Sequence, residues 1–198
     1  MAALGEFYFG AGRGHDHMVY VVIGTGVGAA IIINKQLYYG ESNTSGEVGH
    51  ITVDRNGDVC SCGSRGCLET YTSGPWLTRR YQQTLERNGK TDNTNLSGEE
   101  ITQLAAQGDP TAQSVIQGAG EALGIAVATM AMIINVELYV IGGSVARAGD
   151  LLLEPARRTV PQYSFRAVGE RVQIVASSLG DDGPILGSAW LARQALQS

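Results

Sequence analysis

One segment sets the architecture of this chain: Met18-Val-Tyr-Val-Val-Ile-Gly-Thr-Gly-Val-Gly-Ala-Ala-Ile-Ile-Ile-Asn34. Its two apolar runs favour β-strands over residues 18–23 and 29–34, because branched side chains pack well on a pleated surface. The glycines between them predict a sharp bend. A tight turn at residues 34–36 leads into a further apolar run at 37–39, so the sequence predicts an antiparallel meander of three strands.

Strand and helix patterns alternate through the rest of the chain, which is typical of an α/β fold. Ser73 stands before Gly-Pro75 and predicts a helix start, since proline is tolerated in the first turn. Residues 97–100, Ser-Gly-Glu-Glu, form a capping-box pattern for another helix. The polar segment 88–95 between them is expected to be a loop. The further elements expected are helices at 111–134, 150–160 and 185–196 and strands at 136–141 and 172–176.

The composition describes a globular unit and gives no electrostatic case for nucleic acid. With 198 residues and 43% hydrophobic content, the chain is long and apolar enough for one domain or one large lobe. The net charge is −5, and no basic stripe or helix-turn-helix pattern supplies phosphate contacts. Binding of DNA or RNA by this chain alone is therefore not expected.

Membrane insertion and secretion are not expected either. The longest apolar-rich stretch, residues 122–136, is interrupted by Gly124, Thr129 and Asn135 and falls short of a bilayer span. The N-terminus lacks a basic region followed by an apolar core, so no secretion signal is expected. Together with the clustered cysteines, these features predict a cytoplasmic location.

All three cysteines lie in the segment Cys60-Ser-Cys62-Gly-Ser-Arg-Gly-Cys67, and His50 precedes it by ten residues. Zn²⁺ prefers thiolate and imidazole donors, and a tetrahedral Cys₃His set leaves no position open for water or substrate. A disulfide plus a spare thiol is the alternative, but cysteines separated by one residue bridge poorly and three cannot all pair. We therefore expect a structural zinc site with His50, Cys60, Cys62 and Cys67 as ligands, in a cysteine loop defined as residues 50–67.

A further candidate site is the glycine bend, defined as Gly24-Thr25-Gly26-Val27-Gly28. Residues without a Cβ let backbone N–H groups approach an anion, and Thr25 adds a hydroxyl donor, so the bend can cradle phosphate. Glycine-rich hairpins also occur for turn geometry alone. The bend is not a Rossmann fingerprint, since that motif needs a helix directly after the glycines and residues 29–33 are expected as strand.

A glycine pair, Gly142-Gly143, closes the expected strand at 136–141 and precedes a helix. Open α/β sheets place nucleotides at such a junction. A tight turn from strand to helix explains the pair equally well, so both interpretations stay open.

Polar side chains accompany the expected metal ligands in sequence: Glu47, His50 and Glu69. Carboxylates accept hydrogen bonds from hydroxyl groups, and an imidazole whose other nitrogen faces a metal is fixed in orientation. Such a set suits a polyhydroxylated ligand. An exposed glutamate is otherwise usually a solvated charge, which is the alternative for Glu47 and Glu69.

The order and spacing of these motifs resemble the ROK family, whose name joins repressors, open reading frames and sugar kinases. The resemblance covers nearly the whole chain, and its most specific part is the Cys-x-Cys-Gly-x-x-Gly-Cys loop after Gly-His. The motifs that carry it are Gly24-Thr-Gly-Val-Gly28, Gly46-Glu-Val-Gly-His50, Cys60-x-Cys62-Gly-x-x-Gly-Cys67-Leu-Glu69, Ile141-Gly-Gly143 and Leu179-Gly-Asp-Asp-Gly-Pro184.

The resemblance implies a ribonuclease-H-like lobe of the actin, hexokinase and Hsp70 type, which is a mixed sheet flanked by helices. The cysteine loop would be inserted in it as a zinc knuckle. Residues 1–198 resemble the C-terminal, larger lobe without the N-terminal lobe, and ATP and a sugar bind between two such lobes. The resemblance implies that ATP, with Mg²⁺ in the full-length protein, meets the glycine bend through its phosphates. The other contacts implied are those of adenosine with Gly142 and Gly143 and those of sugar hydroxyls with Glu47, His50 and Glu69.

Departures from the family pattern bear on catalysis. The N-terminal Asp-x-Gly-Gly-Thr phosphate loop has no counterpart in these residues. Family kinases also carry an Asn-Asp pair just before an Ala-rich helix, and its Asp is the general base. Residues 2–6 resemble that helix, so the base would lie upstream of Met1 and no catalytic residue is expected here. Asp181 and Asp182, the obvious substitutes, precede a proline-started helix and are expected to cap it.

The expected function is the sugar- and nucleotide-binding lobe of an ATP-dependent hexose or N-acylhexosamine kinase of the glucokinase kind, itself inactive. The alternative is the inducer-sensing domain of a transcriptional regulator of the same family, since sensing a sugar needs the same hydroxyl contacts. A zinc-held dimerisation module is a further possibility. We also expect a homodimer, formed through the final helix at 185–196, whose apolar face has no evident partner, or through the family's usual dimer surface.

Overall fold

A computed structural model, which describes residues 1–90 and 96–197, contains a mixed five-stranded sheet of order β3-β2-β1-β4-β5. β1 (Met18–Ile23), β2 (Val27–Ile33) and β3 (Gln36–Tyr38) form the predicted antiparallel meander. β4 (Leu138–Gly142) pairs parallel with β1, and β5 (Gln173–Ala176) pairs parallel with β4. β2 begins at Val27 rather than at Ala29, so the last two residues of the glycine bend already pair with β1.

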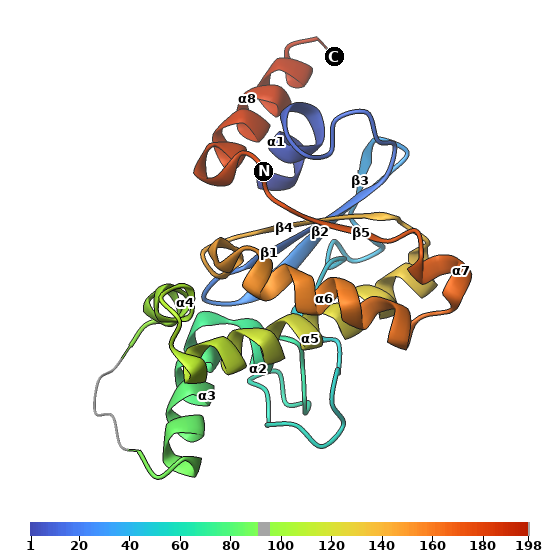
Figure 1. The fold of residues 1–198 in the computed structure, drawn as a ribbon. Helices are drawn as coiled ribbons and strands as arrows, with labels where there is room; N and C mark the ends of the chain where they lie inside the picture. Colours follow the sequence, from blue (N-terminus) through green and yellow to red (C-terminus); the bar gives the residue numbers. More distant parts are fainter. Residues whose placement is uncertain (91–95, 198) are drawn as a thin grey trace.

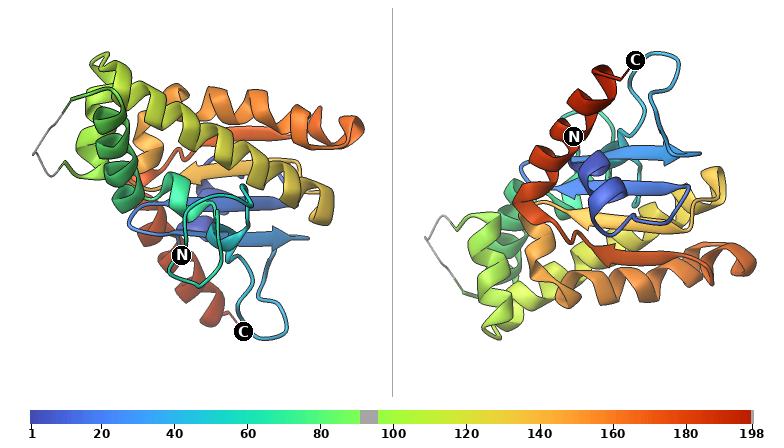
Figure 2. Two further views of the ribbon diagram at one scale, coloured as in Figure 1. Left: turned by 90° about the horizontal axis from the view of Figure 1, so that it is seen from below. Right: turned by 90° about the horizontal axis from the view of Figure 1, so that it is seen from above.

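Helices cover both faces of the sheet: α1 and α8 lie on one face, and α5 and α6 lie on the other (Figures 1 and 2). The predicted loop at 88–95 follows α3, and its residues 91–95 lie outside the described part of the chain. The helices are α1 (Ala2–Phe9), α2 (Glu69–Thr72), α3 (Gly74–Arg87), α4 (Gly98–Ala106), α5 (Pro110–Ile134), α6 (Asp150–Tyr163), α7 (Arg166–Gly169) and α8 (Gly183–Ala195). Short 3-10 turns are η1 (Val48–His50), η2 (Val145–Ala148) and η3 (Gly180–Asp182).

The predicted starts of α3 and α4 differ in their caps. The capping box of α4 is confirmed, because the Ser97 hydroxyl accepts from the Glu100 N–H and the Glu100 carboxylate accepts from the Ser97 N–H. Ser73 holds the N-cap position of α3, but its hydroxyl makes no capping hydrogen bond. Instead, the N–H of Gly74 donates to the carbonyl of Gly24 at 2.8 Å, which ties the start of α3 to the glycine bend.

Alternating side chains of β1 divide the interior into two cores. Val19, Val21 and Ile23 belong to the larger core with α5 and α6, whereas Met18 and Tyr20 belong to the smaller core with α1. Successive side chains of a strand point to opposite faces, so one buried strand serves both cores. The result is the predicted layering of helices, sheet and helices.

α5 is the longest helix in the described part of the chain and runs through the larger core. Its glycines allow close approach to α6, since a Cβ on Gly120 would lie 2.3 Å from the Leu152 carbonyl oxygen. α5 extends well beyond the apolar stretch expected at 122–136, and by length and composition alone it is able to cross a membrane. In the structure, 61% of its most apolar 18-residue window is buried inside the chain, as in the core helix of a globular domain.

The expectation that the final helix lacks a partner is wrong, because α8 packs along α1. The rings of Trp190 and Tyr8 stack with centroids 3.9 Å apart. Gly187 lies against the start of α1, where a Cβ would come within 2.0 Å of the Met1 carbonyl oxygen. Apolar side chains remain outward at this end of the chain: Ile185 is 68% exposed and Leu196 is 88% exposed.

Glu6 fastens α1 to the segment after β5. Its buried carboxylate accepts hydrogen bonds from the hydroxyls of Ser177 and Ser178 and from the backbone N–H groups of Ala11 and Leu179. Burial alone raises the pKa of Glu6, but these hydrogen bonds outweigh it and hold the pKa below its ordinary value. An ionised carboxylate is therefore part of the folded structure.

Candidate functional site

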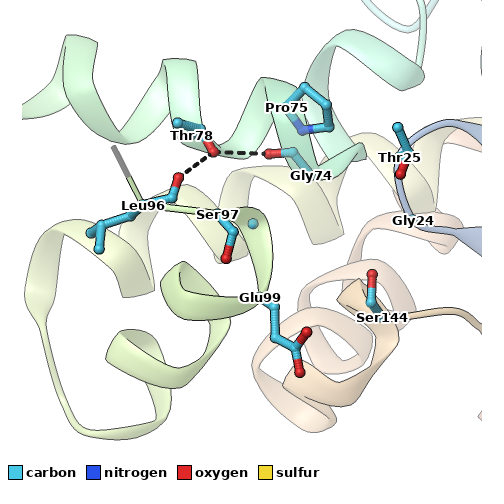
Figure 3. A pocket seen from close by; sticks show the side chains of 10 residues that line it. Gly24, Thr25, Gly74, Pro75, Thr78, Leu96, Ser97, Glu99 and Ser144 are labelled. Carbon is cyan, nitrogen blue, oxygen red and sulfur yellow. Dashed lines mark hydrogen bonds between the residues drawn. The ribbon is translucent and has the colours of Figure 1, made fainter. Parts of the chain in front are cut away.

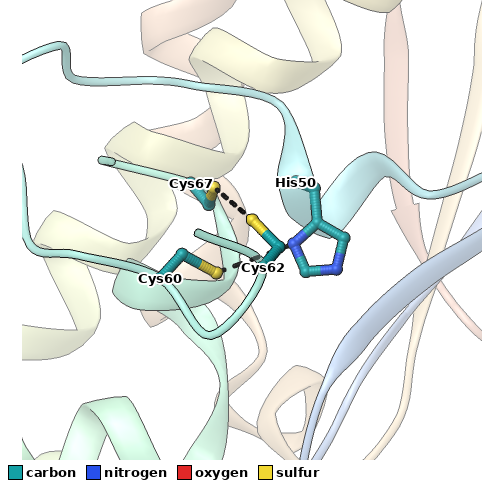
Figure 4. A group of neighbouring side chains, drawn as sticks. All are labelled: His50, Cys60, Cys62 and Cys67. Carbon is teal, nitrogen blue, oxygen red and sulfur yellow. Dashed lines mark hydrogen bonds between the residues drawn. The ribbon is translucent and has the colours of Figure 1, made fainter. Parts of the chain in front are cut away.

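The predicted metal ligands meet in one place. One donor atom from each of His50, Cys60, Cys62 and Cys67 lies within 4.8 Å of all the others (Figure 4). The sulfurs of Cys62 and Cys67 are 3.6 Å apart, and the Cys60 sulfur is 3.7 Å from Nδ1 of His50. Ligands of a tetrahedral zinc ion lie about 3.6 to 3.8 Å from one another, given bond lengths of about 2.0 to 2.3 Å. The Cys₃His cluster, defined as these four residues, can therefore hold a metal ion, and its thiols are not paired in disulfides.

The backbone of the cysteine loop brings the sulfurs together. The N–H of Cys60 donates to the Ser64 carbonyl, and that of Gly63 donates to the Cys60 carbonyl, which curls the loop around the cluster. Gly66 has a φ of +60°, and a Cβ there would lie 1.6 Å from the Asp54 carbonyl oxygen. Only glycine fits at this position, because both the backbone conformation and the space exclude a side chain.

The closeness of the three thiols opposes their joint ionisation. Burial and contacts with the Cys62 and Cys60 thiols raise the pKa of Cys67 to about 12. The pKa of Cys62 is lowered, mainly by a hydrogen bond from the Ser64 backbone. Three sulfurs this close cannot all ionise beside one another unless a positive ion compensates their charge. The donor set thus fits a thiophilic divalent metal.

His50 faces the cluster with one nitrogen and a carboxylate with the other. Its Nε2 lies 4.0 Å from an oxygen of Glu47, whose side chain is 68% exposed, while its Nδ1 lies near the Cys60 sulfur. A ring held from one side by a metal presents its other nitrogen in a fixed direction. The structure thus brings together His50 and Glu47, both of which the sequence predicts as ligand contacts.

Glu69, the third predicted contact, is the first residue of α2 and points toward the glycine bend. Its Oε2 accepts a hydrogen bond from the N–H of Val27 at 3.1 Å, and it lies 3.1 Å from where a Cβ on Gly26 would be. Glu69 follows Cys67 by two residues. One short segment therefore links the cluster to the glycine bend.

The glycine bend opens into a cavity of about 590 Å³, here called the bend cavity (Figure 3). The N-terminal ends of α3 and α4 meet there and bring the positive ends of two helix dipoles to the cavity, although the N–H of Gly74 already donates to the Gly24 carbonyl and that of Glu100 to the Ser97 hydroxyl. Thr78 fixes this wall, because its hydroxyl donates to the carbonyls of Gly74 and Leu96. The lining residues are Gly24, Thr25, Gly74, Pro75, Thr78, Leu96, Ser97, Gly98, Glu99 and Ser144.

Packing does not require glycine at positions 24 and 28 of the bend. A Cβ on Gly28 would meet no atom within 4 Å, and one on Gly24 would meet only the Ser144 hydroxyl at 3.8 Å. Neither residue has the positive φ that favours glycine. Turn geometry alone thus does not explain glycine at these positions, which favours the interpretation that they leave the backbone open to a ligand.

At Gly142 and Gly143, in contrast, neighbouring atoms leave no room for a Cβ. A Cβ on Gly142 would lie 2.1 Å from the hydroxyl oxygen of Tyr20, and one on Gly143, whose φ is +93°, would lie 2.3 Å from the Ile23 carbonyl oxygen. Close packing within the chain already explains both glycines. They nevertheless line a neighbouring cavity of about 580 Å³ that shares Ser144 with the bend cavity.

Asp181 and Asp182 do not cap α8 through their side chains, so that prediction is wrong. Asp182 occupies the N-cap position without a side-chain capping bond. Asp181 instead forms an ion pair with Arg147, whose guanidinium lies 3.2 Å from the Asp181 carboxylate and 3.1 Å from that of Glu99. Arg147 thus joins α4, η2 and η3 beside the bend cavity. Sequence inspection missed it because it lies in none of the motifs and its partners are far away along the chain.

Comparison with known proteins identifies a family and several relatives of this chain. The model of the ROK family matches residues 1–195. The glucokinase of Thermotoga maritima is 35% identical over 96% of this chain and 62% of its own length. The xylose repressor of Bacillus subtilis is 36% identical over 93% of this chain and 46% of its own length.

The fold of this chain also matches a solved structure. The crystal structure of a ROK family glucokinase from Streptomyces griseus in complex with glucose and AMPPNP matches 98% of this chain and 65% of that chain, with a TM-score of 0.84 and 35% sequence identity. The chain spans less than two thirds of each of these proteins. The predicted α/β lobe is confirmed, and this chain belongs to the ROK family.

Proposed function

We propose that residues 1–198 are the C-terminal lobe of an ATP-dependent hexose kinase of the glucokinase kind and carry its sugar and nucleotide contacts. The observation that carries this proposal is the open glycine bend. Gly24 and Gly28 have room for a ligand beside them. The N-terminal ends of α3 and α4 line the bend cavity next to these glycines. A nucleotide phosphate fits such a site, because the positive ends of the helix dipoles favour an anion.

The sugar contacts proposed are Glu47, His50 and Glu69, with a hexose or an N-acylhexosamine as ligand. Carboxylate oxygens accept hydrogen bonds from sugar hydroxyls, and the Nε2 of His50 points to the side of Glu47. Zn²⁺ held by the Cys₃His cluster would play a structural part, since it orients the imidazole and leaves no coordination position for chemistry. The glucose and the nucleotide analogue in the Streptomyces griseus complex support this choice of ligands.

For nucleotide binding we propose the glycine bend, through Gly24, Thr25, Gly26 and Gly28, and the pair Gly142 and Gly143, with Mg²⁺ bound along with ATP in the full-length protein. For these 198 residues alone we expect binding without phosphoryl transfer. The candidate substitute base Asp181 forms an ion pair with Arg147 at 3.2 Å, so its carboxylate is directed to that guanidinium.

The second candidate function is sugar sensing in a transcriptional regulator. It is favoured by the 36% identity to the Bacillus subtilis xylose repressor, which matches nearly the same residues of this chain. A sensor needs the sugar contacts and has no use for a nucleotide. Nucleotide binding therefore separates the two proposals.

The test is calorimetric titration of the purified, zinc-loaded chain with glucose, N-acetylglucosamine, xylose and a non-hydrolysable ATP analogue. The kinase proposal predicts binding of a hexose and, independently, of the ATP analogue. Thr25→Val is expected to weaken only the nucleotide, because it removes the hydroxyl of the glycine bend. Sugar binding without nucleotide binding would instead support the regulator, and absence of both would leave only a zinc-held dimerisation module.

We also propose that the chain forms a homodimer in the cytoplasm and does not bind nucleic acid by itself. The net charge of −5 disfavours contact with phosphates of DNA, and reduced cysteines suit an intracellular compartment.

For the homodimer, exposed Ile185 and Leu196 offer apolar surface for self-association. Sedimentation velocity is expected to show a dimer whose fraction rises with concentration, and a monomer at all concentrations would contradict it.

A further inference from the structure

A basic hollow of about 490 Å³ lies between α3 and the cysteine loop, away from the bend cavity. In Figure 1 both of these segments lie below α5, on the side of the sheet opposite to α1 and α8. We define the arginine hollow by its charged residues, which are Arg65, Arg79, Arg80, Arg87, Asp54 and Asp58. Four arginines against two aspartates leave two positive charges in this hollow, although the whole chain carries −5.

One arginine and both aspartates are already engaged within the protein. Arg80 lies over the Tyr71 ring at 3.8 Å, donates to the Thr70 carbonyl at 2.7 Å and pairs with Asp58 at 3.2 Å. Asp54 accepts hydrogen bonds from the Tyr71 hydroxyl and from the Asn56 N–H. These contacts build a fixed wall, and they leave little acidic capacity for the other arginines.

Three arginines have no carboxylate partner among the residues that the structure describes: Arg65, Arg79 and Arg87. Arg65 reaches only the Gly57 carbonyl, at 3.4 Å, and Arg79 lies over the Trp76 ring at 4.7 Å. Arg79 and Arg87 both belong to α3 and both line the hollow. Like charges gathered around one concave surface repel one another, and a bound anion would relieve this repulsion.

We propose that the arginine hollow binds a small phosphorylated molecule. The guanidinium group presents a planar set of N–H donors whose geometry matches phosphate oxygens. A phosphate monoester carries a charge close to −2, which would neutralise the two excess positive charges of the hollow. The volume of about 490 Å³ is large enough for a small phosphorylated molecule. This site is separate from the glycine bend and does not rest on the proposed kinase activity.

Binding there would also act on the Cys₃His cluster. Arg65, Asp54 and Asp58 belong to the cysteine loop between His50 and Cys67, whereas Arg79 and Arg87 belong to α3. An anion bridging these two groups ties the loop to the helix. The cysteine loop is therefore expected to become more protected when the hollow is filled.

The test is titration of the zinc-loaded chain with inorganic phosphate and with pyrophosphate at constant ionic strength. The double variant R79Q/R87Q is expected to bind pyrophosphate at least about tenfold more weakly, since each substitution removes a charge-assisted contact. Arg13→Gln, which removes an exposed arginine elsewhere, is the matched control and should leave affinity unchanged. Thr25→Val, in the glycine bend, should also leave this binding event unchanged.

Hydrogen exchange locates the site in the same samples. We expect pyrophosphate to protect residues 54–65 and α3 in the wild type and not in R79Q/R87Q. Equal affinity of the wild type and the double variant, or protection confined to the glycine bend, would overturn the proposal. Because α3 is a surface helix at these positions, the double variant should fold. Arg65→Gln, on the opposite wall, provides a second loss-of-binding variant that leaves α3 untouched.

Discussion

His50 occupies the junction of the proposed site because its two ring nitrogens face different partners. Nδ1 lies 3.7 Å from the Cys60 sulfur, and Nε2 lies 4.0 Å from the Glu47 carboxylate. The side chain of His50 is 34% exposed, so it is accessible from solvent while its neighbour Cys60 is buried. A metal on one side would thus set the direction of the hydrogen bond offered on the other.

The substitution Glu47→Gln separates the two roles of this junction. It removes a charged acceptor from the exposed side of His50 and leaves the four metal donors in place. We expect sugar affinity to fall at least about tenfold, because hydrogen bonds to charged groups contribute about 1.5–3 kcal/mol, and zinc content to stay at the wild-type level. Calorimetry and elemental analysis measure the two quantities. His50→Ala is the comparison and should lose both, so an unaltered sugar affinity in Glu47→Gln would contradict the assignment.

Two glycines provide a matched pair for the role of backbone space. Gly28→Ala should change the free energy of unfolding by less than about 0.5 kcal/mol, since its Cβ meets no atom within 4 Å, but should weaken nucleotide binding. Gly66→Ala should destabilise the chain by at least about 2 kcal/mol, because φ is +60° and Asp54 blocks the Cβ. Urea unfolding of both variants checks the contrast, and a large loss of stability in Gly28→Ala would show that its glycine serves packing instead.

At the scale of elements, the strands of the meander and the capping box of α4 follow from local sequence. The Val-rich and Ile-rich runs predicted the meander, and Ser97-Gly-Glu-Glu100 predicted the start of α4. Both features form through contacts between residues that are close along the chain. The partner of α8 was not predictable in this way. Its contact with α1 joins Trp190 to Tyr8 across almost the entire chain. Arg147 was missed for the same reason, since Glu99 and Asp181 come from distant elements.

Glu6, which fastens α1 to the segment after β5, makes the stability of the chain depend on pH. Its pKa is lower in the folded chain than its ordinary value of 4.5, so its contribution is fully present above that value and is lost as the pH falls through the folded pKa. Glu6→Gln should lower the free energy of unfolding at pH 7 by about 1–3 kcal/mol.

The difference between Glu6→Gln and wild type should shrink as the pH is lowered below 4.5. Urea titrations across this range measure it, with the exposed Glu86→Gln as a control that should match the wild type throughout. A difference that stays constant with pH would mean that the carboxylate charge has no part in holding α1.

At the scale of the whole molecule, the sequence motifs predicted that the four residues of the Cys₃His cluster lie together, because these residues are close along the chain. His50, Cys60, Cys62 and Cys67 span a short loop, so their spacing already limited the geometry. The bend cavity was less predictable. Its walls come from the glycine bend, α3, α4 and Ser144, which only the folded chain brings together.

The central claim is that a metal held by the Cys₃His cluster positions the carbohydrate contacts, and zinc removal tests it most directly. Because His50 would serve both metal and sugar, chelation should release the metal, loosen residues 50–67 and abolish sugar binding together. The measurement is sugar titration of the same preparation before chelation, after chelation and after zinc is restored, with metal content determined at each step. We predict one zinc ion per chain, loss of sugar binding without it and recovery when it is returned. Purified chain that holds no zinc, or sugar affinity that is unchanged by chelation, would contradict the account.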